Sequence, residues 1–423
     1  MSDENALLPS AHREQLIYLL TEAAELEHGL MCTYLFAGFS LRREAEGLSD
    51  RERAAIERWR GSVREVAIEE MLHLVIVQNL LTSIGGAPHL QRPNFPVSPG
   101  LYPSGLVLQL RRFDEAALDH FVFLERPEGV EMADGEGFEA AVEHVRGTAF
   151  DVRLMASAQD YSSVGALYRG IEHGFESLTH KLGERELFIG EPTQQVDASL
   201  VDLEGLHPIR DLRSAKAAIA QIIEQGEGGR RAHETSHYDR FCAMRDEYRA
   251  LKAERSTFDP AQPVASNPVM HRPIDPDECA YVSAPEASRI LDLSNAVYGL
   301  MVQLLARLFG AMDDAPARAV LADSAITLMS KVLAPLANLL TTLPIGESRP
   351  GENAGLTFTL PRSTHALPQR GPAWTILGER AAQLAEACGT GRSYAALDAV
   401  GEDVRRVAER VRAVRIASPR DDA

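Results

Sequence analysis

The length and charge of the chain set the first limits on its function. It has 423 residues, 45% of them hydrophobic, which is enough for one large domain or two medium ones with a sizeable core. Its 61 acidic against 43 basic residues give a net charge of −18, which repels phosphate backbones and anionic membrane surfaces. Nucleic-acid and membrane partners are therefore not expected.

The first residues and the cysteines indicate a cytoplasmic protein. The acidic start MSDENALLPS lacks the basic and apolar run of a signal peptide, and no stretch is expected to reach the roughly 20 apolar residues of a membrane span. The four cysteines lie far apart without a CxxC pair, so neither a disulfide framework nor a thiolate zinc site is expected. The 13 histidines and the surplus of carboxylates leave open a metal site with oxygen and nitrogen ligands.

Two long amphipathic helices are predicted at the start of the chain. From about Glu14 to Arg43, small or apolar residues recur at three- and four-residue steps, the period of a helix with one buried face. The same period runs from about Asp50 to Ile84 and stops at a Gly-Gly pair, as a helix C-terminus does.

A long crossover follows. Residues 87–160 are rich in proline and glycine, and Leu106–Leu110 and Phe121–Leu124 are predicted to be β-strands or extended segments. A crossover of this length between the second and third helices is a topology available to four-helix bundles.

Two more helices complete the predicted bundle. The third runs from about Ser163 to Leu182, with a serine as its N-cap. The fourth covers Ala215–Glu224, is interrupted by glycines, and resumes from about Ala232 to Lys252. The predicted fold class is therefore all-α.

The rest of the chain is also predicted to be helical. Several prolines between Asp259 and Asp277 indicate a linker. We predict two domains, a four-helix bundle over residues 1–258 and a C-terminal helical domain over residues 259–423 that packs on it. The helices of the second domain are expected at Pro285–Met312, Ala315–Thr342, Trp374–Cys388 and Ala395–Ala417.

Charged residues interrupt the apolar stripes of the first two helices. Glu27 lies in the stripe of the first helix, where an unpaired buried carboxylate would be costly or would shift its pKa. Tyr34 follows two turns later on the same face. Glu70 interrupts the second stripe, and His73 lies one turn further, so both side chains can reach one ion.

The third and fourth helices repeat this pattern. Glu172 lies between Tyr168 and Phe175 on the inward side, and Glu234 and His237 again have the Glu-x-x-His spacing. Composition alone gives about two acid-x-x-His matches in such a chain, so one match is a weak signal. The order over four helices is stronger, because carboxylate-bridged di-iron and di-manganese bundles are built in this way.

Six ligands of this kind suit two iron ions, with manganese as the alternative. Two divalent ions bring four positive charges, which four carboxylates neutralise, while two histidines add nitrogen ligands and leave open positions for dioxygen. Glu70 and Glu234 are expected to bridge the ions. The full expected ligand set is Glu27, Glu70, His73, Glu172, Glu234 and His237.

Several stretches resemble one known family. TEAAELEHGLMCTYLFAGFSL, EEMLHLVIVQNLLTSIGGAP, GALYRGIEHGF, ELFIGEP, QGEG and SHYDRF are similar to the ferritin-like domain family of the iminophenyl-pyruvate dimer synthase type, related to violacein and rebeccamycin pathways. The resemblance covers about residues 10–250 and implies a ferritin-like bundle with the same six metal ligands. Glu227, in QGEG, stays open as an alternative to Glu234 for the fourth carboxylate.

The expected function is that of a non-haem di-metal oxidase or oxygenase. It would use dioxygen as co-substrate to oxidise a small amino-acid-derived or secondary-metabolite substrate, with Tyr34 and Tyr168 as candidate catalytic residues. Two alternatives are a ferritin-like iron-binding or ferroxidase protein and a scaffold that has lost catalysis. The expected assembly is a monomer or a small homo-oligomer.

Overall fold

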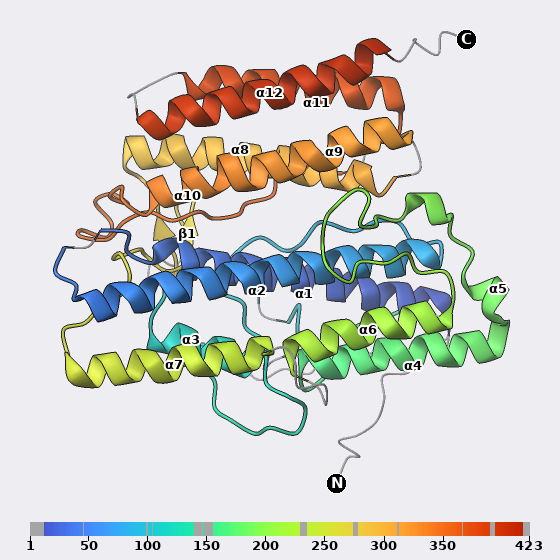
Figure 1. The fold of residues 1–423 in the computed structure, drawn as a ribbon, viewed down its shortest axis with the longest axis horizontal. Coiled ribbons are helices and arrows are strands. Elements are labelled where there is room, and N and C mark those ends of the chain that lie inside the picture. Colours follow the sequence, from blue (N-terminus) through green and yellow to red (C-terminus); the bar gives the residue numbers. More distant parts are fainter. Residues whose placement is uncertain are drawn as a thin grey trace.

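Two long helices form the centre of the molecule. Helix α1 spans Arg13–Ser40 and α2 spans Asp50–Ser83, close to the predicted ranges, and the two pack along their length (Figure 1). Helix α2 begins with a capping box, in which Ser49 and Glu52 each accept a hydrogen bond from the other's backbone N–H. The computed structural model describes residues 12–44, 46–98, 100–103, 105–138, 146, 155–228, 235–273, 278–310, 313–365, 367–389 and 394–417.

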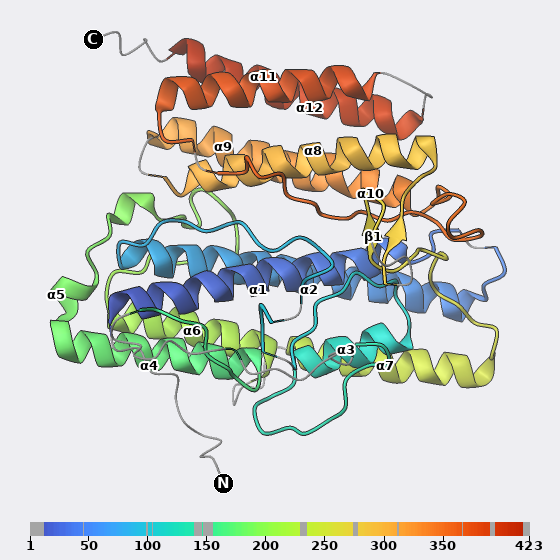
Figure 2. The same cartoon turned by 180° about the vertical axis from the view of Figure 1, so that it is seen from behind.

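Four shorter helices cover one side of this pair, and they form two interrupted lines. Helix α3 packs against α7, and α4 packs against α6. Figures 1 and 2 show α6 and α7 end to end in one line and α3 and α4 end to end in the other. Each of the third and fourth bundle positions is thus filled by two helices that meet near the middle of the bundle. Their bounds are Glu115–Leu124 for α3, Val164–Leu182 for α4, Leu212–Gly226 for α6 and His237–Glu254 for α7.

The crossover differs from the prediction at one important point. Phe121–Leu124 belongs to α3 and is not a strand. The side chain of Asp114 caps this helix by accepting a hydrogen bond from the backbone N–H of Ala117, and an apolar run of this length fits a buried helix as well as a strand. Leu106–Leu110 belongs to none of the helices or strands of the described residues. The other short elements are α5 (Glu184–Leu187), the 3-10 helix η1 (Pro192–Gln194) and two parallel strands, β1 (Pro268–Val269) and β2 (Ala280–Tyr281).

The C-terminal helices cover the opposite side of α1 and α2 (Figure 1). Helices α9, η2 and α10 form one continuous rod, in which η2 is a π-helical segment. Pro335 is the second residue after this segment; it has no N–H to donate, and the wider π turn accommodates it within the rod. The bounds are Pro285–Leu308 for α8, Ala315–Thr327 for α9, Leu328–Leu333 for η2, Ala334–Leu340 for α10, Arg370–Cys388 for α11 and Ala395–Ala417 for α12.

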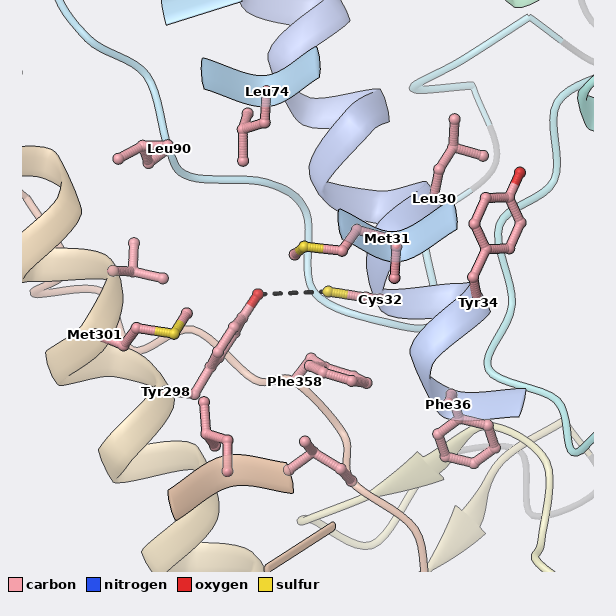
Figure 3. Packing of buried hydrophobic residues seen from close by; sticks show 14 of the residues in the cluster. Leu30, Met31, Cys32, Tyr34, Phe36, Leu74, Leu90, Tyr298, Met301 and Phe358 are labelled. Atoms are coloured by element: carbon pink, nitrogen blue, oxygen red, sulfur yellow. Dashed lines mark hydrogen bonds between the residues drawn. The ribbon is translucent and has the colours of Figure 1, made fainter. Parts of the chain in front are cut away.

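The two sides of the molecule share buried contacts. Figure 3 shows Tyr298 of α8 directed towards Cys32 of α1, with 3.5 Å between the hydroxyl oxygen and Sγ. The predicted linker is packed at its start, since Ala261 and Val264 are buried and Asn267 exchanges two hydrogen bonds with the backbone of Leu110. That segment is therefore part of the core, and the division at residue 258 stays a prediction.

Two helices are long and apolar enough to cross a membrane by length and composition, contrary to the expectation from the sequence. These are α2 and the rod over Ala315–Leu340. In α2, 78% of the most apolar window is buried inside the protein, and in the rod the figure is 50%. Helix α2 is therefore mostly buried, like a helix in the core of a globular protein. Its length and apolar composition are weak evidence that it crosses a membrane.

Candidate metal centre

Five acidic and histidine side chains converge where the two lines of short helices are interrupted. Glu27 comes from the middle of α1, and Glu70 and His73 come from α2. Glu125 is the C-cap residue of α3, and His237 is the first residue of α7. All five are buried, with exposed fractions between 0% and 6%. Carboxylates at this depth need compensation by cations or protons.

The five side chains form two groups that share one carboxylate. Glu27, Glu70 and His73 make one group, and Glu70, Glu125 and His237 make the other, with the ligand atoms of each group within 4.8 Å of one another. The two oxygens of Glu70 divide between the groups: Oε2 lies 3.3 Å from His73 Nδ1, and Oε1 lies 3.0 Å from His237 Nδ1. Each group offers two oxygens and one nitrogen, and Glu70 is placed to bridge two ions.

Outer hydrogen bonds orient both histidine rings. His73 Nε2 lies 3.0 Å from Gln225 Oε1, and His237 Nε2 lies 2.8 Å from Glu69 Oε2. Since amide and carboxylate oxygens only accept, each Nε2 donates, and the Nδ1 lone pair of each neutral ring is directed to the cluster. Arg240 Nη2 in turn donates to Glu69 Oε1 over 3.0 Å and fixes that carboxylate.

We expect Glu69→Ala to weaken metal binding by roughly 10- to 100-fold at the His237 side, because the ring loses the partner that sets its tautomer and orientation. Titration calorimetry with Mn(II) measures this change. Glu65→Ala is the matched control, since Glu65 lies one turn earlier on α2 and is exposed. Equal affinity in the two variants would contradict the orienting role of Glu69.

The donor set fits a pair of divalent metal ions. Glu27 Oε2 and His237 Nδ1 are buried and have no well-aligned hydrogen-bond partner among the described residues, although both belong to the cluster. Unpartnered buried donors and acceptors are rare in folded proteins. Three carboxylates and two imidazoles are also the ligand types that iron and manganese accept.

The buried carboxylates and histidines of this cluster shift one another's pKa. Burial raises the pKa of Glu27 to about 8, and the neighbouring Glu70 carboxylate adds to that shift. Burial alone would lower the pKa of His73, but hydrogen bonds to Glu27 and Glu70 raise it to about 10. The pKa of His237 is also raised well above its usual value by its carboxylate neighbours, against burial. Burial would raise the pKa of Glu70, but the two histidines hold it well below its usual range.

Two tyrosines donate hydrogen bonds to the outer carboxylates. The Tyr34 hydroxyl donates to Glu125 Oε1 over 2.5 Å, and the Tyr168 hydroxyl donates to Glu27 Oε1. Burial and the nearby carboxylates raise the pKa of both phenols well above the usual value, so both stay protonated donors. Tyr34 therefore holds Glu125, and Tyr168 holds Glu27, in each case through the Oε1 oxygen.

A pocket leads to the cluster through the gap between the short helices. Its cavity volume is about 20 Å³, within about 330 Å³ of empty space that includes open solvent. Leu30, Leu124, Val164, Ile222 and Ile223 give it an apolar wall, while four members of the cluster and Tyr168 line its polar part. An apolar wall beside a charged cluster is typical of sites that keep water away from a reaction.

The structure brings together four of the six predicted ligands. Glu27, Glu70, His73 and His237 meet in the cluster. Glu172 does not, because it lies on the flank of α4, where its side chain is 29% exposed and 3.2 Å from Lys216 Nζ. Glu234 lies outside the described residues. Helix α7 begins at His237, after the N-cap Ser236.

Sequence reasoning missed Glu125, which occupies the position expected for Glu172. The only signal was a carboxylate directly after the apolar run of Phe121–Leu124, in a segment predicted to be irregular. Glu227, the alternative fourth carboxylate, lines the pocket but is paired with Arg169. The ligand roles of all these residues stay predictions.

Comparison with known proteins assigns the family. A model of the family described as "Ferritin-like" matches residues 20–246, more than half of the chain. The chain belongs to the ferritin-like family. This confirms the all-α, ferritin-like fold predicted from the sequence.

The relatives of this ferritin-like chain agree with the predicted resemblance. It is 30% identical to dichlorochromopyrrolate synthase of Lentzea aerocolonigenes, over 90% of this chain and 39% of the relative. It is 27% identical to 2-imino-3-(indol-3-yl)propanoate dimerase of Chromobacterium violaceum, over 88% of this chain and 36% of the relative. Both relatives are named as enzymes, which confirms the resemblance to the iminophenyl-pyruvate dimer synthase type. The chain spans less than two fifths of the length of each of them.

A solved ferritin-like protein from Caulobacter vibrioides is a more distant neighbour. Its TM-score is 0.49 at 17% identity, over 78% of this chain and 96% of that one. A likeness of this strength adds nothing to the family assignment.

Proposed function

We propose that this ferritin-like protein is an O2-dependent di-metal oxidase or oxygenase. The observation that carries the proposal is the shared Glu70, which joins two buried groups of metal-ligand type in one cluster. Two iron or manganese ions held there would supply the reduction of dioxygen and the oxidation of an organic substrate. Glu27 and His73 would hold one ion, Glu125 and His237 the other.

The chain's own residues support this chemistry in three ways. Tyr34 and Tyr168 hold the outer carboxylates by donating to them, and we propose that Tyr168, which also lines the pocket, contacts the substrate. Glu69 and Gln225 fix the histidine tautomers. The apolar wall excludes water from the space in front of the cluster.

We infer that the substrate is a small acid derived from an aromatic amino acid. One relative is named for 2-imino-3-(indol-3-yl)propanoate, an imino acid with an indole ring, and the other for a chromopyrrolate. The pocket suits such a molecule chemically, because it combines an apolar wall with charged groups. We also propose a cytoplasmic monomer or small homo-oligomer.

The test is dioxygen uptake by protein that has been loaded with Fe(II) under anaerobic conditions. The substrate is 2-imino-3-(indol-3-yl)propanoate, formed in the cuvette from the matching 2-oxo acid and ammonia. We expect sustained uptake that depends on the organic acid and that continues after the iron has turned over many times.

The same experiment separates the alternatives. Uptake that stops after one round of iron oxidation and ignores the organic acid would indicate a ferroxidase. A chain that retains no metal after loading would indicate a scaffold and would contradict the proposal.

A further inference from the structure

A carboxylate-binding cradle adjoins the pocket, which Glu227 and Gly165 line. Arg169 Nη2 lies 3.2 Å from Oε1 and 3.1 Å from Oε2 of Glu227, so it contacts both oxygens. The backbone N–H of Glu128 donates to the same carboxylate. The Glu227 side chain lies so close to Gly165, in the first turn of α4, that a Cβ at position 165 would collide with it.

The cradle has the properties of an anion site. A guanidinium group binds a carboxylate through charge-assisted hydrogen bonds, and the first turn of a helix presents free N–H groups and a positive dipole end. Val164 and Gly165 of that turn line the pocket, as does Glu227. The Glu227 side chain bound there therefore shows that the cradle accepts a carboxylate group.

Glu227 has a second position within reach. The cluster holds three carboxylates, whereas two divalent ions bring four positive charges. The preceding residue, Gly226, lies so near the cluster that a Cβ there would be 3.2 Å from Glu125 Oε2. Glu227 lines the pocket together with Glu70 and Glu125, so a rotation of its side chain within the pocket would move its carboxylate from Arg169 towards these residues and leave the cradle free.

We propose that this cradle binds the carboxylate of the substrate, with Arg169 as its anchor, and that Glu227 gives way when the substrate binds. The inference rests on the proposed function and names the residue that would recognise the carboxylate of its substrate. An acid anchored there would place its α-carbon on the side of the cluster, because Glu227 and Gly165 of the cradle line the same pocket as the cluster. Arg169 would then determine specificity, since an amide or a decarboxylated analogue cannot make the same charged contact.

The test uses the whole chain, freed of metal by a chelator, and needs neither metal nor dioxygen. The probes are indole-3-propanoate and its neutral amide, and their affinities are measured by titration calorimetry. In Glu227→Ala the cradle is free, and we expect the acid to bind about tenfold or more tightly than it binds to the unaltered protein. Adding Arg169→Met to that variant should remove the gain, and the amide should respond to neither change.

Glu128→Ala is the matched control. The Glu128 carboxylate contacts the same guanidinium, with 2.5 Å between Oε2 and Nε, but it does not line the pocket. Both single variants raise the net charge equally, so a general electrostatic effect would strengthen binding in both alike. An equal gain in both, no gain in Glu227→Ala, or equal binding of acid and amide would overturn the proposal. Circular dichroism and thermal unfolding verify that each variant folds. A failure of dioxygen turnover would leave this binding result unaffected.

Discussion

Glu70→Ala is expected to reduce metal content from about two ions per chain to one or fewer. Glu70 is the carboxylate that both ligand groups share, with one oxygen facing His73 and the other facing His237. Its loss removes a ligand from each ion and leaves two histidine rings, whose centroids are 5.5 Å apart, without the anion between them. Elemental analysis after iron or manganese loading and desalting measures the result.

Glu172→Ala provides a control for that experiment. It removes the same chemical group from the same bundle, but Glu172 is 29% exposed and paired with Lys216. We expect this variant to keep both ions. If Glu172→Ala lost an ion while Glu70→Ala kept two, the ligand set read from the structure would be wrong. The isosteric Glu70→Gln keeps the packing, and a loss of metal in that variant as well would exclude unfolding as the cause.

The α1 and α2 part of the cluster could be predicted from sequence. These helices are long and regular, so Glu27 and Glu70 stand out as charges inside apolar stripes, and His73 follows at helical spacing. Burial of these residues at 1% to 2% exposure agrees with that interpretation. A regular helix fixes the direction of each side chain, which makes such predictions possible.

The rest of the cluster depends on where helices end, which sequence patterns define poorly. Glu125 lies just beyond the end of α3, and His237 lies at the start of α7, so neither belongs to a repeating inward stripe. Glu172 seemed inward because it lies between Tyr168 and Phe175. The face of α4 that is buried runs through Tyr168, Ile171 and Phe175, and Glu172 is about 100° from Ile171, towards Lys216 of α6.

The interruption between α6 and α7 was predicted from the glycines in the fourth helix, whereas the end-to-end placement of α3 and α4 was not predicted. Helices α3 and α4 are separated by a long stretch of chain, and α3 is held by packing on α7 while α4 is held by packing on α1 and α6. The breaks between the short helices determine which groups reach the site. They bring a helix C-cap, a helix start and the pocket mouth to the level of Glu27 and Glu70, where continuous helices would present only side chains from their flanks.

Metal affinity is expected to rise steeply with pH. A metal ligand must be deprotonated, yet at pH 7 the metal-free cluster holds protons on Glu27, with a pKa of about 8, and on His73, with a pKa of about 10. His237, whose pKa is also raised, holds another. Loading both ions near pH 7 should therefore release about three protons, and the combined affinity should rise by up to about 1,000-fold per pH unit. Above pH 8 Glu27 loses its proton without metal, so the rise should become shallower.

Calorimetric titration with Mn(II) in buffers of different ionisation enthalpy counts the released protons directly. Removing one protonated ligand, as in His73→Ala, should lower the count by about one and also weaken one site, whereas Glu172→Ala should leave the count unchanged. Release close to zero at pH 7, with an affinity that does not change between pH 6 and pH 9, would contradict the protonated cluster. Carboxylates buried to this depth need either protons or cations beside them. Metal binding must therefore replace the bound protons of the cluster with metal ions.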